Sequence, residues 1–237
     1  MLHKESLERR LKFFEDLQRR NAIVIVDTSA LEIGVGRNMS DHENVIVNNL
    51  NIRLLQALTR MVQEKKSTFY LTEEVADEIE NSIDFLSKLR EFSARRFTRA
   101  GALFLETLEE RDLIFDPRCP YASLYCREFA VRDPILLSQT GYILDQCTGT
   151  KKGKDVSETD KGLLIAGIYG ASLGGEKPIL LVTNDWDITH TYEWFMTCYR
   201  MLLEVSSPIE HTGRLLEKLY NMREVKIKAF PHSQMTH

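Results

Sequence analysis

The stretch IVIVDTSAL, residues 23–31, is a run of β-branched apolar residues that ends at Asp27 and continues with small polar side chains. Such runs are typical of buried strands. Two further stretches fit this pattern, STFYLT at 67–72 and PILLVTND at 178–185. Helical patterns separate the three, so we expect an α/β fold with a parallel sheet covered by helices on both faces. Ligands of such sheets bind beyond the carboxyl ends of the strands, which is where Asp27 lies.

Helical patterns occupy most of the remaining chain. Residues 4–20 repeat apolar side chains at helical spacing and predict a leading amphipathic helix that packs on the main domain. Thr72 and Ser157 are placed to cap two further helices, and a glycine stop ends the second. The predicted elements are helices over about 45–65, 73–89, 157–175, 189–203 and 209–222 and a last strand within 224–230.

The middle of the chain, from 90 to about 155, lacks a clear strand signal and is broken by prolines and by Gly141. We therefore expect a mostly helical insertion, inside a domain over 21–237 that follows a leading helix over 1–20. The stretch GTKKGKD at 149–155 predicts a mobile basic loop.

Composition limits the class of protein. The 237 residues are 43% apolar with a net charge of -4, which suits one soluble globular domain with an elaboration, or two small ones. Apolar runs fall far below the roughly 18 residues of a membrane span, the N-terminus is charged, and the four cysteines form no C-x-x-C pair. We expect a cytoplasmic protein with reduced thiols and no membrane contact. The slightly acidic total still permits a local basic groove.

Acidic residues lie at the ends of predicted strands and near the starts of predicted helices, which the expected fold would bring together at one edge of the sheet. Asp27 and Asp185 each follow an apolar strand, Asp187 comes two residues later, Asp160 lies in the first turn of a helix, and Glu78 lies about one turn into another. Carboxylates collected at one edge repel one another unless a counterion is bound. Oxygen ligation favours Mg²⁺ or Mn²⁺, whereas the histidines show no zinc-binding spacing.

Each acid also has a structural explanation. Asp27 and Asp185 are suitable turn or cap residues after strands, and Asp160 completes a capping box with Ser157. Glu74, one turn before Glu78 on the same helix face, is a rival for its position.

Four stretches taken together, VDTSAL, VADEIE, ETDKGLLIAG and LLVTNDWD, resemble in their order the PIN-domain nucleases. The resemblance covers roughly residues 21–80 and 156–206. It implies a PIN-like, Rossmann-like three-layer α/β/α sandwich with a central parallel sheet. By the family pattern the catalytic and metal-binding acids are Asp27, Glu78, Asp160 and Asp185, with Asp187 as an accessory metal ligand and Ser29, Thr183 and Asn184 in support. The leading helix and the long stretch between Glu78 and Asp160 depart from the compact toxin members.

The resemblance implies Mg²⁺- or Mn²⁺-dependent hydrolysis of a phosphodiester that leaves a 5'-phosphate. An endonuclease that cuts single-stranded RNA is the expected activity, and a homodimer is left open. One ion would be held mainly by Asp27, Asp160 and Asp185, and a second would lie near Glu78.

Substrate phosphates need cations near the acids. The candidates are Arg37, Arg95, Arg96, Arg99, Lys151, Lys152 and Lys154. Trp186 could stack on a base or lie in the core.

Two alternatives stay open. A non-catalytic PIN-like scaffold would bind RNA or a protein through the insertion. A haloacid-dehalogenase-type phosphatase also places an Asp after its first strand, but its D-x-D motif would need a second Asp where Ser29 stands.

Overall fold

The computed structural model is a mostly helical α/β protein with a small parallel sheet. It describes residues 2–31, 41–129, 133–147, 156–205, 222 and 224–229. The helices are α1 (Leu2–Arg19), α2 (Thr28–Leu31), α3 (Asp41–Gln63), α4 (Glu73–Ser87), α5 (Phe92–Glu109), α6 (Ser123–Glu128), α7 (Pro134–Cys147), α8 (Glu158–Ser172) and α9 (Trp186–Val205). The strands are β1 (Ile23–Val26), β2 (Leu71–Thr72), β3 (Ile114–Phe115), β4 (Ile179–Thr183) and β5 (Lys226–Ala229).

The strands pair in parallel throughout the described chain. β4 lies between β1 and β5, and Val26 of β1 stands beside Val182 of β4. β2 pairs with β3, and a parallel bridge between Ile25 and Tyr70 joins this pair to β1. Because all these strands run in one direction, the carboxyl ends of β1 and β4 meet at the same edge, as the sequence predicts.

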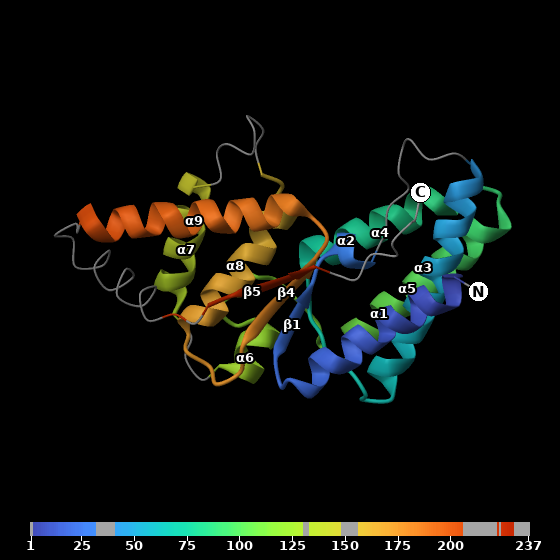
Figure 1. Ribbon diagram of the computed structural model, residues 1–237, viewed down its shortest axis with the longest axis horizontal. Helices are drawn as coiled ribbons and strands as arrows, with labels where there is room; N and C mark the ends of the chain where they lie inside the picture. Colours follow the sequence, from blue (N-terminus) through green and yellow to red (C-terminus); the bar gives the residue numbers. More distant parts are fainter. Residues whose placement is uncertain are drawn as a thin grey trace.

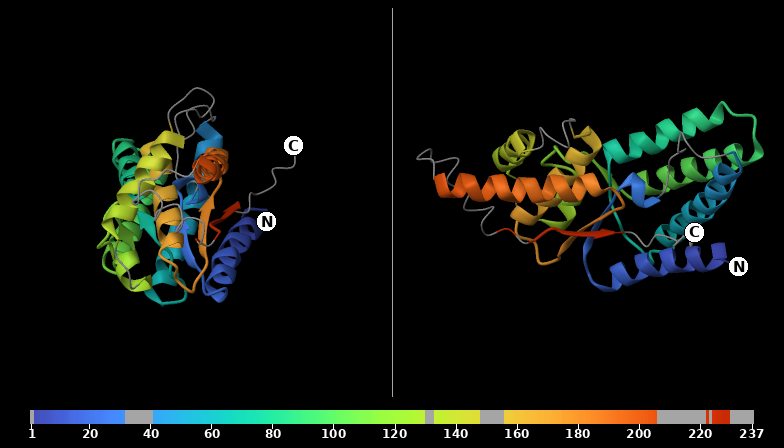
Figure 2. Two further views of the ribbon diagram at one scale, coloured as in Figure 1. Left: turned by 90° about the vertical axis from the view of Figure 1, so that its left-hand side faces the viewer. Right: turned by 45° about the horizontal axis from the view of Figure 1, so that its top comes forward.

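Helices lie to both sides of the strands (Figures 1 and 2). In Figure 1 and in the right-hand view of Figure 2, α7, α8 and α9 gather on one side of β1 and β4, and α1, α3, α4 and α5 gather on the other. α2 and the first turn of α4 lie close to the point where β1 ends, near the middle of the molecule (Figure 1). This arrangement supports the α/β expectation.

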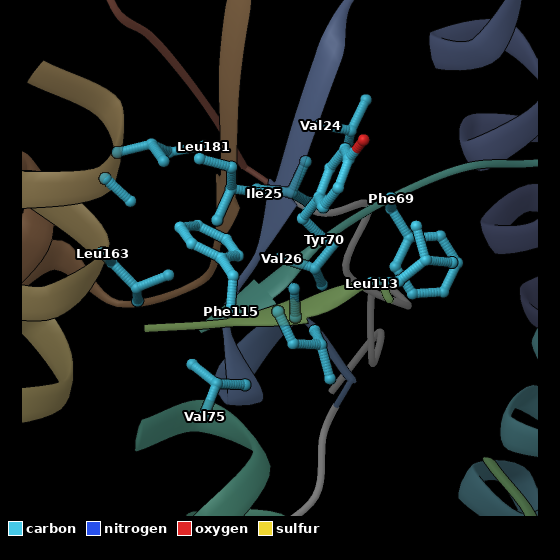
Figure 3. Close-up of a cluster of buried hydrophobic side chains, with 14 of the residues drawn as sticks. Val24, Ile25, Val26, Phe69, Tyr70, Val75, Leu113, Phe115, Leu163 and Leu181 are labelled. Carbon is cyan, nitrogen blue, oxygen red and sulfur yellow. The ribbon is translucent and has the colours of Figure 1, made fainter. Parts of the chain in front are cut away.

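The core explains why β1 and β4 are continuous apolar runs. All four residues of β1 and all five of β4 are buried, which requires cover on both faces of the sheet. Figure 3 shows Ile25 of β1 and Leu181 of β4 beside the ring of Phe115 from β3. Phe69 and Leu113 extend the same cluster toward the helices on the far side of β1 (Figure 3).

Two strands differ from what the sequence indicates. The second strand is only Leu71–Thr72, shorter than the predicted 67–72. The region from 90 to about 155, which lacks a clear strand signal in the sequence, contains a short strand, because Ile114–Phe115 pairs with β2. A two-residue strand is too short for an alternating or continuous apolar pattern to reveal it. The described residues of this region otherwise form the helices α5, α6 and α7 and their connections.

The helix boundaries mostly follow their predicted signals. The Thr72 hydroxyl accepts from the Val75 N–H at 3.4 Å, and the Ser157 hydroxyl accepts from the Asp160 N–H at 3.1 Å. α8 is followed by Gly174 at φ 79°, a conformation that glycine adopts without steric cost. α3 begins four residues earlier than expected and α9 three residues earlier.

The predicted basic loop at 149–155 and residues 209–221 of the predicted helix at 209–222 lie outside the described residues. No helix in the described chain combines the length and the apolar character that crossing a membrane requires.

Candidate acidic site

Asp27 occupies the first position after β1 and is nearly enclosed. The residue is 6% exposed, and its N–H continues the sheet by donating to the Val182 carbonyl at 2.9 Å. Carboxylate oxygen Oδ2 accepts hydrogen bonds from the Ser29 hydroxyl and, at 2.7 Å, from the Thr183 hydroxyl. Two neighbouring hydroxyls therefore fix one oxygen of this carboxylate.

Burial raises the pKa of Asp27 above its ordinary value, because the charged form loses water. The hydrogen bonds from Ser29 and Thr183 oppose that effect. The negative charges of Asp160 and Glu78 add to it, so they raise the pKa of Asp27 further. Asp160 and Glu78 therefore both act on Asp27 electrostatically, although β1, α4 and α8 are distant in sequence.

Glu78 is held by two hydroxyl groups. Its Oε2 accepts from the Thr28 hydroxyl at 2.6 Å, and its Oε1 accepts from the Thr159 hydroxyl at 2.6 Å. Thr28 directly follows Asp27, and Thr159 directly precedes Asp160. Glu78 is thus tied to the neighbours of both other acids, and this accounts for its proximity to them.

Asp160 combines a structural position with membership of this cluster. It lies in the first turn of α8, where its N–H donates to the Ser157 hydroxyl, and the residue is only 5% exposed. A carboxylate buried at a helix N-terminus is stabilised by the helix dipole. We call Asp27, Glu78 and Asp160 the acidic cluster.

Asp185 directly precedes α9, and Asp187 is the second residue of this helix. The Asp185 Oδ1 accepts from the Asp187 N–H at 2.8 Å, as a helix-capping side chain does, and Asp187 lies in the first turn. Asp185 therefore acts as a helix cap, which is the structural role that the sequence allowed for it. Its half-buried side chain also lies at the edge of the sheet where β4 ends. Between the two acids, Trp186 is 77% exposed, so the expectation that it could be a core residue was wrong.

Ser29, Thr183 and Asn184 join the ends of β1 and β4. The Asn184 N–H donates to the Ser29 hydroxyl at 2.9 Å, and the Asn184 side-chain amide donates to the Ser29 carbonyl at 3.3 Å. The Thr183 hydroxyl, which donates to Asp27, also accepts from the Asp185 N–H at 2.9 Å. These three residues hold Asp27 and Asp185 in a fixed relation across two parallel strands.

Glu74 has other partners than the hydroxyl groups that bind Asp27 and Glu78. Its Oε1 forms an ion pair with Arg118, which also pairs with Glu158 at 3.0 Å. The Glu74 carboxylate lies against Gly162 of α8, since a Cβ there would stand 2.8 Å from its oxygens. Of the two rival glutamates, Glu78 is the one whose charge acts on Asp27.

The predicted cations are not gathered at the acidic cluster in the described chain. Arg95, Arg96 and Arg99 are exposed on α5. α5 follows the C-terminal end of α4, whereas Glu78 lies near the N-terminal end of α4. Arg37, Lys151, Lys152 and Lys154 lie outside the described residues. Near the first turn of α8 the structure instead places Arg118 and Lys161. Lys161 pairs with Glu158 at 3.1 Å and with Asp145 at 3.3 Å.

Sequence reasoning missed Thr28, Thr159 and Arg118. The threonines immediately flank two of the predicted acids, and this adjacency was the only signal available for them. Arg118 gave no comparable signal, because its partners lie 44 and 40 residues away in the chain.

The chemistry of the donor set fits a hard divalent cation. The site offers carboxylate and hydroxyl oxygens, which Mg²⁺ and Mn²⁺ prefer. Asp27, Asp160 and Asp185, with Glu78, are the residues that could hold such an ion. In the described part of the chain, however, no three Asp, Glu, His or Cys side chains are grouped closely enough to hold a metal ion together.

Comparison of the chain with models of protein families, with curated proteins and with solved structures gives no match.

Proposed function

We propose that this protein is a metal-dependent nuclease that hydrolyses phosphodiester bonds, with single-stranded RNA as its substrate. The observation that supports this most is the convergence of Asp27, Glu78 and Asp160 beyond the carboxyl end of β1. Each of the other two acids raises the pKa of Asp27. The order of four motifs that resemble PIN-domain nucleases supports the same assignment.

The proposed ligands of the ion are Asp27, Asp160 and Asp185, with Glu78 and Asp187 available to a second. When bound, a divalent cation activates a water molecule and neutralises charge at the scissile phosphate.

The residues around the acids have positioning roles in this proposal. Ser29 and Thr183 donate to the same oxygen of Asp27 and so fix the orientation of its carboxylate. Thr28 and Thr159 hold both oxygens of Glu78, which limits the rotation of its side chain. Preorganised acids of this kind lower the cost of ordering the site when substrate binds.

A non-catalytic scaffold that binds RNA or protein is the second candidate. The exposed aromatic and basic side chains of α4 and α5 favour binding, and they would serve a scaffold as well as an enzyme. The phosphatase alternative has less support, because Ser29 stands where a second Asp is required.

The test is cleavage of end-labelled single-stranded RNA and DNA by the purified full chain with Mn²⁺, Mg²⁺ or EDTA, compared with the Asp27→Asn variant. We expect metal-dependent cutting that the variant loses, and RNA cut faster than DNA. Cutting by the variant at the wild-type rate would indicate a contaminant. No cutting by either protein would favour the scaffold.

A thermal unfolding series with Mn²⁺ gives a second readout that does not depend on activity. Binding to the folded state raises the unfolding midpoint as the Mn²⁺ concentration increases. The Asp27→Asn variant should show a smaller rise, because it lacks one proposed ligand.

A further inference from the structure

Three large apolar side chains are exposed where α4 turns into α5. Phe85 is 55% exposed, Leu89 38% and Phe92 77%, and all three fall within eight residues of chain. Exposed apolar groups in such proximity mark binding surfaces more often than isolated ones do. We call residues 85–99 the hairpin tip.

The hairpin tip is strongly basic although the whole chain carries a net charge of -4. Its exposed cations are Lys88, Arg90, Arg95, Arg96 and Arg99, against a single acid, Glu91. The Arg96 guanidinium lies over the Phe92 ring, 5.9 Å from its centre. Aromatic faces interleaved with arginines suit a ligand that has both flat rings and phosphates.

The position of Phe85 on α4 connects this surface with the acidic cluster. Phe85 follows Glu78 by seven residues, which is close to two helical turns, so both side chains lie on one face of α4. Their separation along the helix axis is about 10 Å at 1.5 Å per residue. A ligand at Glu78 therefore needs only a short continuation along α4 to reach Phe85.

The adjacent face of the hairpin is unsuitable for phosphates. A cleft of about 550 Å³ between α4 and α5 is lined by Glu73, Asp77, Glu80, Asp84, Glu106, Glu109 and Asp112 among others. Like charges would repel a nucleic-acid backbone from this cleft. The charge distribution thus favours a path along the Glu78 and Phe85 face toward the arginines.

We propose that the hairpin tip binds single-stranded nucleic acid that extends beyond the acidic cluster, with bases stacked on Phe85 and Phe92 and phosphates held by the arginines. The inference rests on the proposed function, since it identifies where the rest of the substrate lies. An anionic membrane would also attract this surface, but the shared face with Glu78 favours a ligand that reaches both places.

The binding test uses the full chain with Asp27→Asn to prevent cleavage, and fluorescein-labelled oligouridylates of 4 and 16 nucleotides. Phe85→Ala with Phe92→Ala should weaken binding of the 16-mer by at least about tenfold, since a stacked base contributes about 1–3 kcal/mol. Binding of the 4-mer should stay within about twofold. Leu103→Ala is the matched control, because Leu103 is another exposed apolar residue of α5, outside the tip.

The charge test replaces Arg95, Arg96 and Arg99 with Gln. The slope of log affinity against log salt should then fall by up to about 2, because each phosphate contact on a single strand contributes about 0.7. We call the chain with both Phe85→Ala and Phe92→Ala the aromatic variant. With Asp27 intact, this variant should raise KM for the 16-mer and leave kcat unchanged.

Equal binding of the 16-mer by the aromatic variant and by Leu103→Ala would overturn the inference. The wild-type chain could instead float with phosphatidylserine vesicles while the aromatic variant does not, with RNA binding the same for both. That result would overturn the nucleic-acid proposal and identify the hairpin tip as a membrane-contacting surface. If the wild-type chain cuts nothing but the 16-mer still depends on the tip, the nuclease proposal fails and the binding surface stands.

Discussion

At the scale of single residues, the pKa of Asp27 links the acidic cluster to stability. Burial, Asp160 and Glu78 all favour its neutral form in the folded protein. A raised folded pKa means that this group's contribution to stability is fully present below the unfolded value of about 3.9 and is lost as pH rises through the folded pKa. Above that pH, the folded protein carries the whole cost of an ionised and buried Asp27.

Asp27→Asn removes this charge while its amide oxygen can still accept from Ser29 and Thr183. We expect the variant to have a higher free energy of unfolding than the wild type at neutral pH without metal. The advantage should shrink as pH falls toward 4. Urea unfolding of both proteins at several pH values in EDTA measures the difference. A variant less stable than the wild type at pH 7 would show that the carboxylate is needed as a structural acceptor.

The two rival glutamates make the second prediction at this scale. Glu78→Gln should lower kcat by about 100-fold, a typical loss for a group that acts on the reacting centre, because its charge belongs to the acidic cluster. Glu74→Gln should lower kcat by less than about threefold, and loss of its partly exposed pair with Arg118 should cost at most about 1 kcal/mol.

Steady-state cleavage rates with saturating Mn²⁺, compared at equal folded fraction by circular dichroism, give this ranking. If Glu74→Gln is the more damaging change, the second acid of the site is Glu74 rather than Glu78.

At the scale of elements, glycines decide how closely α8 approaches its neighbours. A Cβ at Gly170 would stand 2.7 Å from Cδ1 of Ile179 in β4 and 3.4 Å from the Phe129 ring. A Cβ at Gly141 in α7 would stand 3.8 Å from Cδ1 of Ile165, an ordinary contact. The same substitution should therefore have opposite effects at the two positions.

Gly141→Ala should stabilise the protein by about 0.5–1 kcal/mol, because alanine has the higher helix propensity. Gly170→Ala should destabilise it by about 1–3 kcal/mol, the usual cost of overpacking, despite the same propensity gain. Chemical denaturation of both variants measures the two shifts. A stabilised Gly170→Ala would mean that Ile179 can change rotamer and accept the methyl group.

The elements also show what sequence could predict. Continuous apolar runs identified β1 and β4, and their parallel pairing followed from the helices between them. The threonine and serine caps fixed where α4 and α8 begin, and hence placed Glu78 and Asp160 within their helices. The donors to Glu78 could not be predicted, since Thr28 and Thr159 lie 50 and 81 residues away and no local pattern encodes such pairs.

At the scale of the whole molecule, α1 shares the core of the elements that carry the acids. Phe14 of α1 is 1% exposed, and its ring lies 5.5 Å from that of Phe69. The Phe69 ring in turn stacks 6.1 Å from that of Phe104 in α5. This row of rings joins α1, the segment before β2 and α5, so α1 should unfold together with the rest of the protein.

Phe14→Ala tests this cooperativity and should cost about 3–5 kcal/mol, as truncation of a fully buried aromatic residue does. Its neighbour Phe13 is only half-buried, so Phe13→Ala is the control and should cost clearly less. Native-state hydrogen exchange separates a global effect from a local one. If the molecule is one cooperative unit, the most protected amides of α8 lose as much protection as those of α1, although α8 lies across β1 and β4 from α1 (Figure 1). Loss of protection confined to α1 would instead make this helix a separable addition, and its removal should then leave the acidic cluster and its activity in place.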